Sequence, residues 1–116
     1  MSLMAVEFMD AGKLRTRLVL EAPVRTPDEA GGQDVQWHAV GEFFAHVEPV
    51  GARQTTEGEA ERQEITHRVT LRHRNDVSPA MRLLRNGHAM RVETVRDLDG
   101  SGRYLVCGCK EMEGWI

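Results

Sequence analysis

The sequence predicts an all-β protein, a small antiparallel β-barrel of six or seven strands with one long acidic loop and little helix. Three observations predict this fold: segments in which apolar and polar residues alternate, an Asn-Gly pair between two such segments, and an aromatic content of only 5%. The alternation is clearest in residues 65–74. One face has Ile65, His67, Val69, Leu71 and His73, and the other has Thr66, Arg68, Thr70, Arg72 and Arg74. A period of two is typical of a strand with one buried face.

The length of the chain indicates one domain. With 116 residues, positions 1–116 are expected to form a single barrel, preceded by an arm at residues 1–12. The low aromatic content and a mean hydropathy of −0.44 indicate a thin aliphatic core. Residues 1–10 carry two acids and no base, unlike a secretory signal, and no apolar run is long enough to span a membrane. The protein is therefore expected to begin in the cytosol, with no membrane partner.

The first half of the chain predicts three strands, at residues 14–21, 35–40 and 43–48. Turn residues separate them: Pro23, Pro27 and residues 28–32 after the first strand, and Gly41 after the second. Pro49 is expected to end the third strand, because proline cannot donate a hydrogen bond to a sheet. The large aromatic side chains of these strands are interpreted as core: Trp37, Phe43 and Phe44.

Residues 51–63 are predicted to form a protruding loop. The segment is polar and acidic, too long for a tight hairpin turn and too hydrophilic for the core. A loose helical turn over residues 52–60 is an option within it. Its acidic side chains are Glu57, Glu59 and Glu61. They lack the spacing of a calcium loop, so a solvated charged surface is the plainer interpretation.

The second half predicts five elements in order: a strand at 65–74, one helical turn from Ser78 and Pro79, a hairpin at 81–95, a turn at 98–102 and a last strand at 103–112. The hairpin signal is strong, because Asn86-Gly87 adopts the positive φ angles of a type I′ turn. Consecutive antiparallel strands are expected to pair as a meander.

No residue pattern predicts a catalytic, cofactor or metal site, so the protein is expected not to be an enzyme and to need no cofactor. The histidines lack the spacing of a zinc motif: His38, His46, His67, His73 and His88. Ser78 and Ser101 lie in turns without a glycine elbow. Cys107 and Cys109 are expected to be reduced and packed, because Cα atoms two apart in a strand, roughly 6.5–7 Å, give a strained disulfide.

Charge is unevenly distributed along the chain. Residues 1–67 carry 12 acidic and 6 basic side chains, whereas residues 68–116 carry 6 acidic and 9 basic ones. The simpler interpretation is that acidic and basic side chains are mixed over the folded surface. The more specific one is that an acidic region of one copy contacts a basic region of the next. The net charge of −3 argues against tight binding driven by DNA phosphates. An oligonucleotide-binding barrel is the alternative function, but the Thr and Arg face of residues 66–74 offers no aromatic platform for bases.

Short motifs in a fixed order resemble the phage head-tail joining family, the connector or stopper proteins of long-tailed phages, prophages and gene transfer agents. The motifs are Gly12-Lys13-Leu14-Arg15, residues 27–32 followed by Val35-Gln36-Trp37, Phe44-Ala45-His46-Val47-Glu48-Pro49, residues 66–72, Ser78-Pro79-Ala80-Met81-Arg82 and Cys109-Lys110-Glu111. The resemblance covers nearly the whole chain. It departs after the third strand, where Arg53-Gln54-Thr55-Thr56 replaces the family's more usual aromatic residues.

The resemblance implies a ring of twelve copies in the neck of a virion or phage-like particle, assembled in the bacterial host cytoplasm. The ring lies below the portal and its adaptor and above the tail. Residues 51–63, with Glu57, Glu59 and Glu61, are expected to point toward the channel, where acidic side chains repel passing double-stranded DNA and help to retain or gate it without sequence-specific binding. Arg68, Arg72 and Arg74 are expected at subunit or adaptor contacts. The sequence does not decide whether the particle is a phage or a gene transfer agent, or whether the protein is a connector or a stopper.

Overall fold

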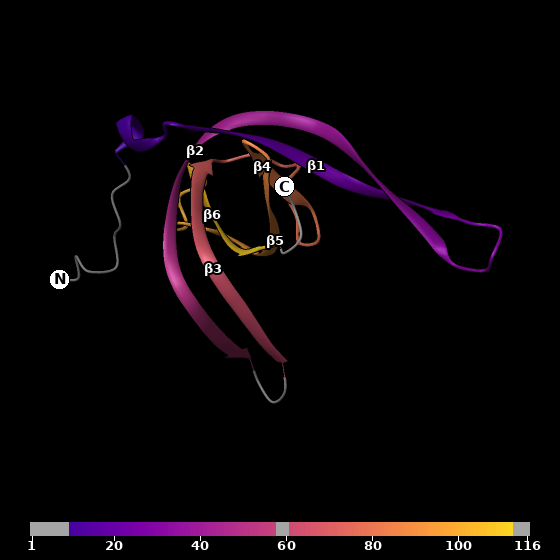
Figure 1. The fold of residues 1–116 in the computed structure, drawn as a ribbon. Helices are drawn as coiled ribbons and strands as arrows, with labels where there is room; N and C mark the ends of the chain where they lie inside the picture. The colour runs from indigo at the N-terminus through magenta and orange to yellow at the C-terminus, as the bar shows by residue number, and fades with distance from the viewer. Residues whose placement is uncertain (1–9, 58–60, 113–116) are drawn as a thin grey trace.

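The protein is a closed six-stranded antiparallel β-barrel (Figure 1), as the sequence predicts. The computed structural model describes the backbone of residues 10–57 and 61–112 and the side chains of residues 10–50 and 64–112. Its elements are the short 3-10 helix η2 (Ala11–Lys13) and the strands β1 (Thr16–Pro27), β2 (Gln33–Glu57), β3 (Glu61–Arg72), β4 (Arg82–Arg85), β5 (His88–Asp97) and β6 (Tyr104–Glu111). Of the expected arm at residues 1–12, residues 1–9 lie outside the described residues.

The strand order around the barrel is β1-β2-β3-β6-β5-β4, so the predicted meander is wrong after β3. The chain leaves β3, crosses to the edge of β1 and forms the β4–β5 hairpin there. β4 pairs with β1 over Val19–Glu21, and β6 returns to pair with β3. In this order β4 closes the barrel on β1, so every strand has two neighbours.

The core is aliphatic and thin, as the composition predicts. The fully buried large side chains are Leu18, Leu20, Val69, Leu71, Leu83, Val92, Cys107 and Cys109. Alternate positions along β1, β3 and β6 supply most of them, which confirms the period-two patterns. One residue of the polar face of β3 is buried. Thr70 is only 5% exposed and pairs with the buried Val106 of β6.

The predicted end of the first strand is wrong, because β1 continues through Pro23 to Pro27. Beyond Glu21, β1 pairs only with β2 among the described residues, so the position of Pro23 has one edge without a paired strand in that part of the chain. A proline fits such an edge, since its missing N–H can face away from the neighbouring strand.

The second and third predicted strands are one strand, β2, which also continues past Pro49. Gly41 pairs with Leu20 where the register of β1 and β2 shifts, so it lies at a bulge rather than at a chain break. A second register shift, between Pro49 and Arg53, accommodates the proline. Bulges of this kind bend a strand without ending it.

The predicted loop at residues 51–63 is instead a two-stranded ribbon formed by the ends of β2 and β3. The register pairs Arg53 with Ile65 and continues to Glu57 opposite Glu61, and residues 58–60 lie outside the described residues. The optional helical turn is therefore wrong over the described part. Because this ribbon extends away from the barrel (Figure 1), it needs no alternation of apolar residues, which is why its polarity resembled that of a loop.

The turns predicted at residues 86–87 and 98–102 are confirmed. Asn86 and Gly87 have φ of 47° and 81°, as a type I′ turn requires, and join β4 directly to β5. In the turn before β6, the Asp97 carboxylate accepts hydrogen bonds from the backbone N–H groups of Gly100 and Gly102 at 2.6 and 3.0 Å. The helical turn expected from Ser78 and Pro79 is wrong, because Ala80 has a φ of 78° and the segment is a simple turn in which Met81 N donates to Ser78 O at 3.3 Å.

The three aromatic side chains that were expected in the core have different surroundings. Phe43 packs against the core as predicted. Trp37 lies outside the core cluster and stacks under Arg82, whose guanidinium carbon is 4.2 Å from the ring centroid. Phe44 is 56% exposed, so its assignment to the core is wrong. Phe44 follows Phe43 directly, and neighbours in a strand face opposite sides of the sheet.

Cys107 and Cys109 are free and buried, as expected. Burial raises the pKa of the Cys107 thiol from 9.0 to about 12. Burial, with Cys107 and Glu93 nearby, raises the pKa of Cys109 well above its ordinary value. Because the thiolate is the reactive form, both side chains are packing groups rather than nucleophiles.

The native protein should therefore be nearly inert to a thiol-specific disulfide reagent near pH 8. A pKa of about 12 in place of 9.0 lowers the thiolate fraction about a thousandfold. After denaturation both thiols should react fully, which the released chromophore measures. Rapid reaction of the native protein would contradict the buried placement.

Candidate functional site

The β2–β3 ribbon carries the acidic residues that the sequence singled out. Glu57 and Glu61 are the last register pair before the ribbon's end, so their backbones lie directly opposite each other. Glu59 lies outside the described residues. The pairing of β2 with β3 thus concentrates acidic positions at the far end of a projection from the barrel.

The base of this ribbon is fixed to β6 by polar contacts. The Thr66 hydroxyl accepts a hydrogen bond from Glu111 N at 2.8 Å, and Lys110 Nζ lies 3.6 Å from Glu64 Oε1. The side chain of Ile65 lies over Gly108, where a Cβ atom would be 3.0 Å from Ile65 Cδ1. These contacts set the direction in which the ribbon leaves the barrel.

Arg68 and Arg72 lie exposed on the outer face of β3, as the alternation predicts. Arg68 Nε donates to Glu48 Oε1 at 2.9 Å, across the pairing with β2. Arg72 lies over the ring of Tyr104, 5.9 Å from its centroid, and has no carboxylate partner within the described residues. Of these two arginines, Arg72 is therefore the one whose charge can pair with a carboxylate of another molecule.

Arg74 differs from the other two arginines because it lies beyond the end of β3 at Arg72, so its predicted place on the outer face of that strand is wrong. Its Nε and Nη2 atoms each donate to the Asp76 carboxylate at 2.9 Å, and its guanidinium lies 5.2 Å from the Phe43 centroid. A Cβ atom at Gly41 would collide with Arg74 Nη2, so the glycine leaves the space that this guanidinium fills. The hydrogen bond from Arg74 lowers the pKa of Asp76, and the same bond raises the pKa of Arg74.

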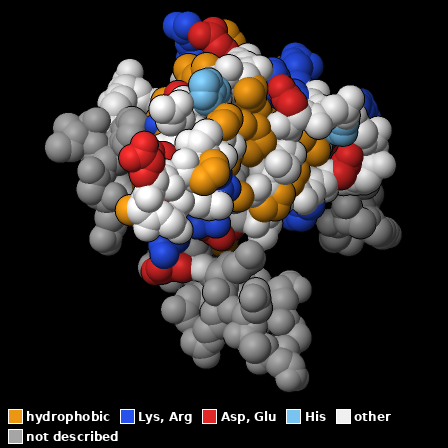
Figure 2. All heavy atoms as spheres, turned by 90° about the vertical axis from the view of Figure 1, so that its right-hand side faces the viewer, with side chains coloured by type: hydrophobic (Ala, Val, Ile, Leu, Met, Phe, Trp, Pro, Cys, Tyr) orange, Lys and Arg blue, Asp and Glu red, His pale blue; other side chains and the backbone are white. Residues whose placement is uncertain are grey.

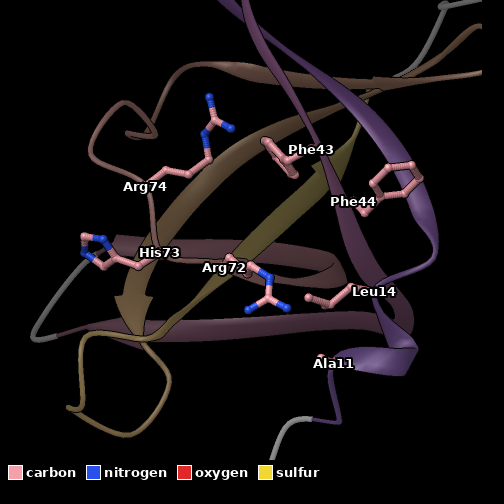
Figure 3. A pocket seen from close by; sticks show the side chains of 7 residues that line it. All are labelled: Ala11, Leu14, Phe43, Phe44, Arg72, His73 and Arg74. Carbon is pink, nitrogen blue, oxygen red and sulfur yellow. The ribbon is translucent and has the colours of Figure 1, made fainter.

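A cleft lies where η2 and Leu14 approach β2 at Phe43 and Phe44 and the end of β3 at Arg72 (Figure 3). Its lining residues are Ala11, Leu14, Phe43, Phe44, Arg72, His73 and Arg74. It encloses about 440 Å³ and combines exposed aromatic surface with basic side chains. We call it the Phe44 cleft. The sequence analysis did not predict this cleft, because it assigned Phe44 to the core.

A second feature that sequence reasoning missed is an almost buried ion pair. Arg82 and Glu21 are 61 positions apart, and Arg82 Nη2 lies 2.8 Å from Glu21 Oε1. Their side chains are only 10% and 14% exposed. The pair joins β4 to β1, and Trp37 packs against its guanidinium. No local pattern predicts it, because only barrel closure brings the two residues together.

Within the described part of the chain, no group of three or more His, Cys, Asp or Glu side chains could hold a metal ion. No helix in that part has the length and apolar character to cross a membrane.

Comparison with known proteins assigns the chain to a family. The family model of the phage head completion protein matches residues 9–112, nearly the whole chain. The chain belongs to the phage head completion protein family. Membership confirms the family that the sequence motifs resemble and makes the protein a structural component of a phage-like particle.

Two solved structures are similar to this chain. A chain from the virion of a native gene transfer agent particle has 26% identity and a TM-score of 0.63, over 85% of this chain and 96% of that one. The solution structure of a Shigella flexneri 2a protein has 21% identity and a TM-score of 0.67, over 91% and 99% of the two chains, and supports the fold alone. No curated protein matches in sequence.

Replacing Asp76 with Asn should lower thermal stability at neutral pH, because Arg74 loses its charged acceptor. The lowered pKa of Asp76 means that its contribution is present above its ordinary value of 3.8 and is lost as the pH falls through the lowered pKa. The difference in Tm should be a few degrees at most, as for a half-exposed ion pair worth roughly 1 kcal/mol or less. It should vanish near pH 2.

Thermal unfolding followed by circular dichroism from pH 7 to pH 2 measures this difference. Asp34→Asn is the matched control, since Asp34 is exposed and has no ion pair within the described residues. Equal effects of the two substitutions would show that the Arg74–Asp76 pair does not stabilise the fold.

Proposed function

We propose that the chain is a subunit of the connector or stopper ring that joins the DNA-filled head of a phage-like particle to its tail. The observation that supports this most is the likeness to a chain from a gene transfer agent virion, which this chain matches over 96% of that chain's length at 26% identity. A structural role, without catalysis, is part of the proposal. The resemblance seen in the sequence motifs supports a ring of twelve copies between the portal with its adaptor and the tail.

The shape of the subunit suits this role. A closed barrel has no long open edge along its core strands, so assembly depends on what projects from it. The β2–β3 ribbon is one projection, and its acidic end is the part proposed to face the channel. Negative side chains there repel DNA phosphates, so DNA passes without adhering.

Arg68, Arg72 and Arg74 are proposed to contribute to contacts between subunits or with the adaptor. Arg72 fits this role best, because it is exposed and has no carboxylate partner within the described residues. Arg68 shares its face but already binds Glu48, and Arg74 is bound to Asp76, so both would contribute mainly by shaping the surface.

One observation supports the alternative function, an oligonucleotide-binding barrel. Arg72 lies against Tyr104 and lines the same cleft as the exposed Phe44, so the face does offer aromatic surface. Single strands bind such faces with micromolar or tighter, strongly salt-dependent affinity. That affinity in a fluorescence titration would favour the alternative, and the family assignment favours the connector.

Deletion of the gene in a particle-producing strain tests the proposed function. We expect heads that package DNA but carry no tails, seen by negative-stain electron microscopy, and full recovery when the gene is supplied in trans. A normal yield of tailed particles after deletion would overturn the proposal.

Charge reversal at Arg68 and Arg72 to Glu should lower the yield of tailed particles at least about tenfold, since each 1.4 kcal/mol lost from a contact lowers its equilibrium constant tenfold. Packaged heads should accumulate instead, as counted in micrographs. Arg91→Glu is the control, because Arg91 is also exposed and lies on β5, away from this face. Equal yields from all variants would refute a role for the β3 arginines.

Neutralising the ribbon by Glu57→Gln, Glu59→Gln and Glu61→Gln together should change DNA retention, because the repulsion between ribbon and phosphates is removed. We expect a severalfold change in nuclease-sensitive DNA released from filled particles. Glu93→Gln, on β5, serves as the control. Unchanged leakage would count against a channel position for the ribbon.

A further inference from the structure

The outer part of the β1–β2 hairpin projects from the barrel and pairs with no third strand among the described residues. Pairing of β1 with β4 ends at Glu21, and pairing of β2 with β3 begins at Ala45, so the hairpin between them is a two-stranded ribbon in the described part of the chain. Figure 1 shows it extending to one side of the barrel. Val24 and Val35 near its tip are 41% and 44% exposed. Figure 2 looks from this side and shows a group of hydrophobic side chains bordered by charged ones.

The Phe44 cleft lies at the other end of the same two strands. Phe44 pairs with Arg17 at the start of β1, and Val35 pairs with Arg25 near its end. Eight positions of extended strand separate these pairs, about 26 Å. The tip of the hairpin therefore cannot reach the cleft of its own subunit.

The two surfaces are complementary in charge and in apolar character. The hairpin tip carries three acidic side chains, Asp28, Glu29 and Asp34, and one basic one, Arg25. None of the residues that line the cleft is acidic, and Arg72 has no carboxylate partner within the described residues. Each surface also presents an apolar group, the valines on one and Phe44 on the other. Aromatic side chains beside arginine are the composition typical of binding hot spots.

We propose that the tip of the β1–β2 hairpin of one subunit docks in the Phe44 cleft of a neighbouring copy, with Val35 against Phe44 and Asp34 near Arg72. This inference rests on the proposed ring and names its contact. The hairpin tip and the cleft lie at opposite ends of one subunit, so their contact between copies is heterologous. Such contacts close into a ring when a whole number of copies completes one full turn.

Engineered cysteines test the contact in assembled particles. A chain carrying Val35→Cys and Phe44→Cys should form a ladder of disulfide-linked multimers after mild oxidation, seen on a non-reducing gel. The native Cys107 and Cys109 are buried and should not contribute. The control chain carries Val35→Cys and Arg91→Cys. Arg91 is exposed, but it does not line the cleft. A ladder from the first chain alone supports the docking, and its absence overturns it.

A charge exchange provides a second test that does not depend on oxidation. Asp34→Arg and Arg72→Asp should each lower the yield of tailed particles about tenfold, and the double variant should recover most of the loss. Thermal unfolding checks that all three variants fold. A double variant no better than the worse single variant would show that these two residues do not meet.

The outcomes separate this contact from the proposed function. Tailed particles without linked multimers would leave the connector role intact and refute the hairpin contact. A cross-link to a different particle protein, or within one chain, would also refute it by showing another occupant of the cleft. Normal tails after gene deletion would refute the connector role whatever the gel shows.

Discussion

Closure of the barrel at the β1–β4 seam is the constraint on which the rest of the structure depends. β4 is four residues long, and it pairs with β1 over only three positions. The seam holds because Leu20 and Leu83 pair there and are fully buried, and because the Glu21–Arg82 ion pair lies beside them almost out of solvent. An open seam would expose the apolar interior and two strand edges, and would release the fixed direction of both projecting hairpins.

The elements that local patterns specify were predictable from the sequence. The type I′ turn at Asn86-Gly87, the alternation along β3 and the packing of both cysteines depend on neighbours in the chain, and all three were predicted correctly. Pro23 and Pro49 were misread because the effect of a proline depends on whether a neighbouring strand or a bulge is present. Those features belong to the pairing and not to the residue. The strand order failed for the same reason, since β4 finds its partner in β1, about 60 positions away.

The candidate surfaces show the same division. Alternation placed Arg68 and Arg72 on the outside of β3, but it could not distinguish an arginine held by Glu48 from one with no carboxylate partner in the described part of the chain. Nor could it place Phe44, because Phe43 and Phe44 are adjacent and only one can face the core. Arg74 and Gly41 form their contact across β2 and the loop after β3, where no sequence period applies. Surface chemistry is therefore set by the partners that closure supplies.

A single strand of 25 residues, β2, runs through both projections. It begins at the tip of one hairpin, wraps one side of the barrel and ends at the acidic tip of the other (Figure 1). Hydrogen bonding to β1 and β3 supports it for most of its length, and its bulges are the places where it can bend. A mechanical load on one tip thus travels to the other through continuous backbone, and the subunit can behave as a lever rather than as a passive spacer.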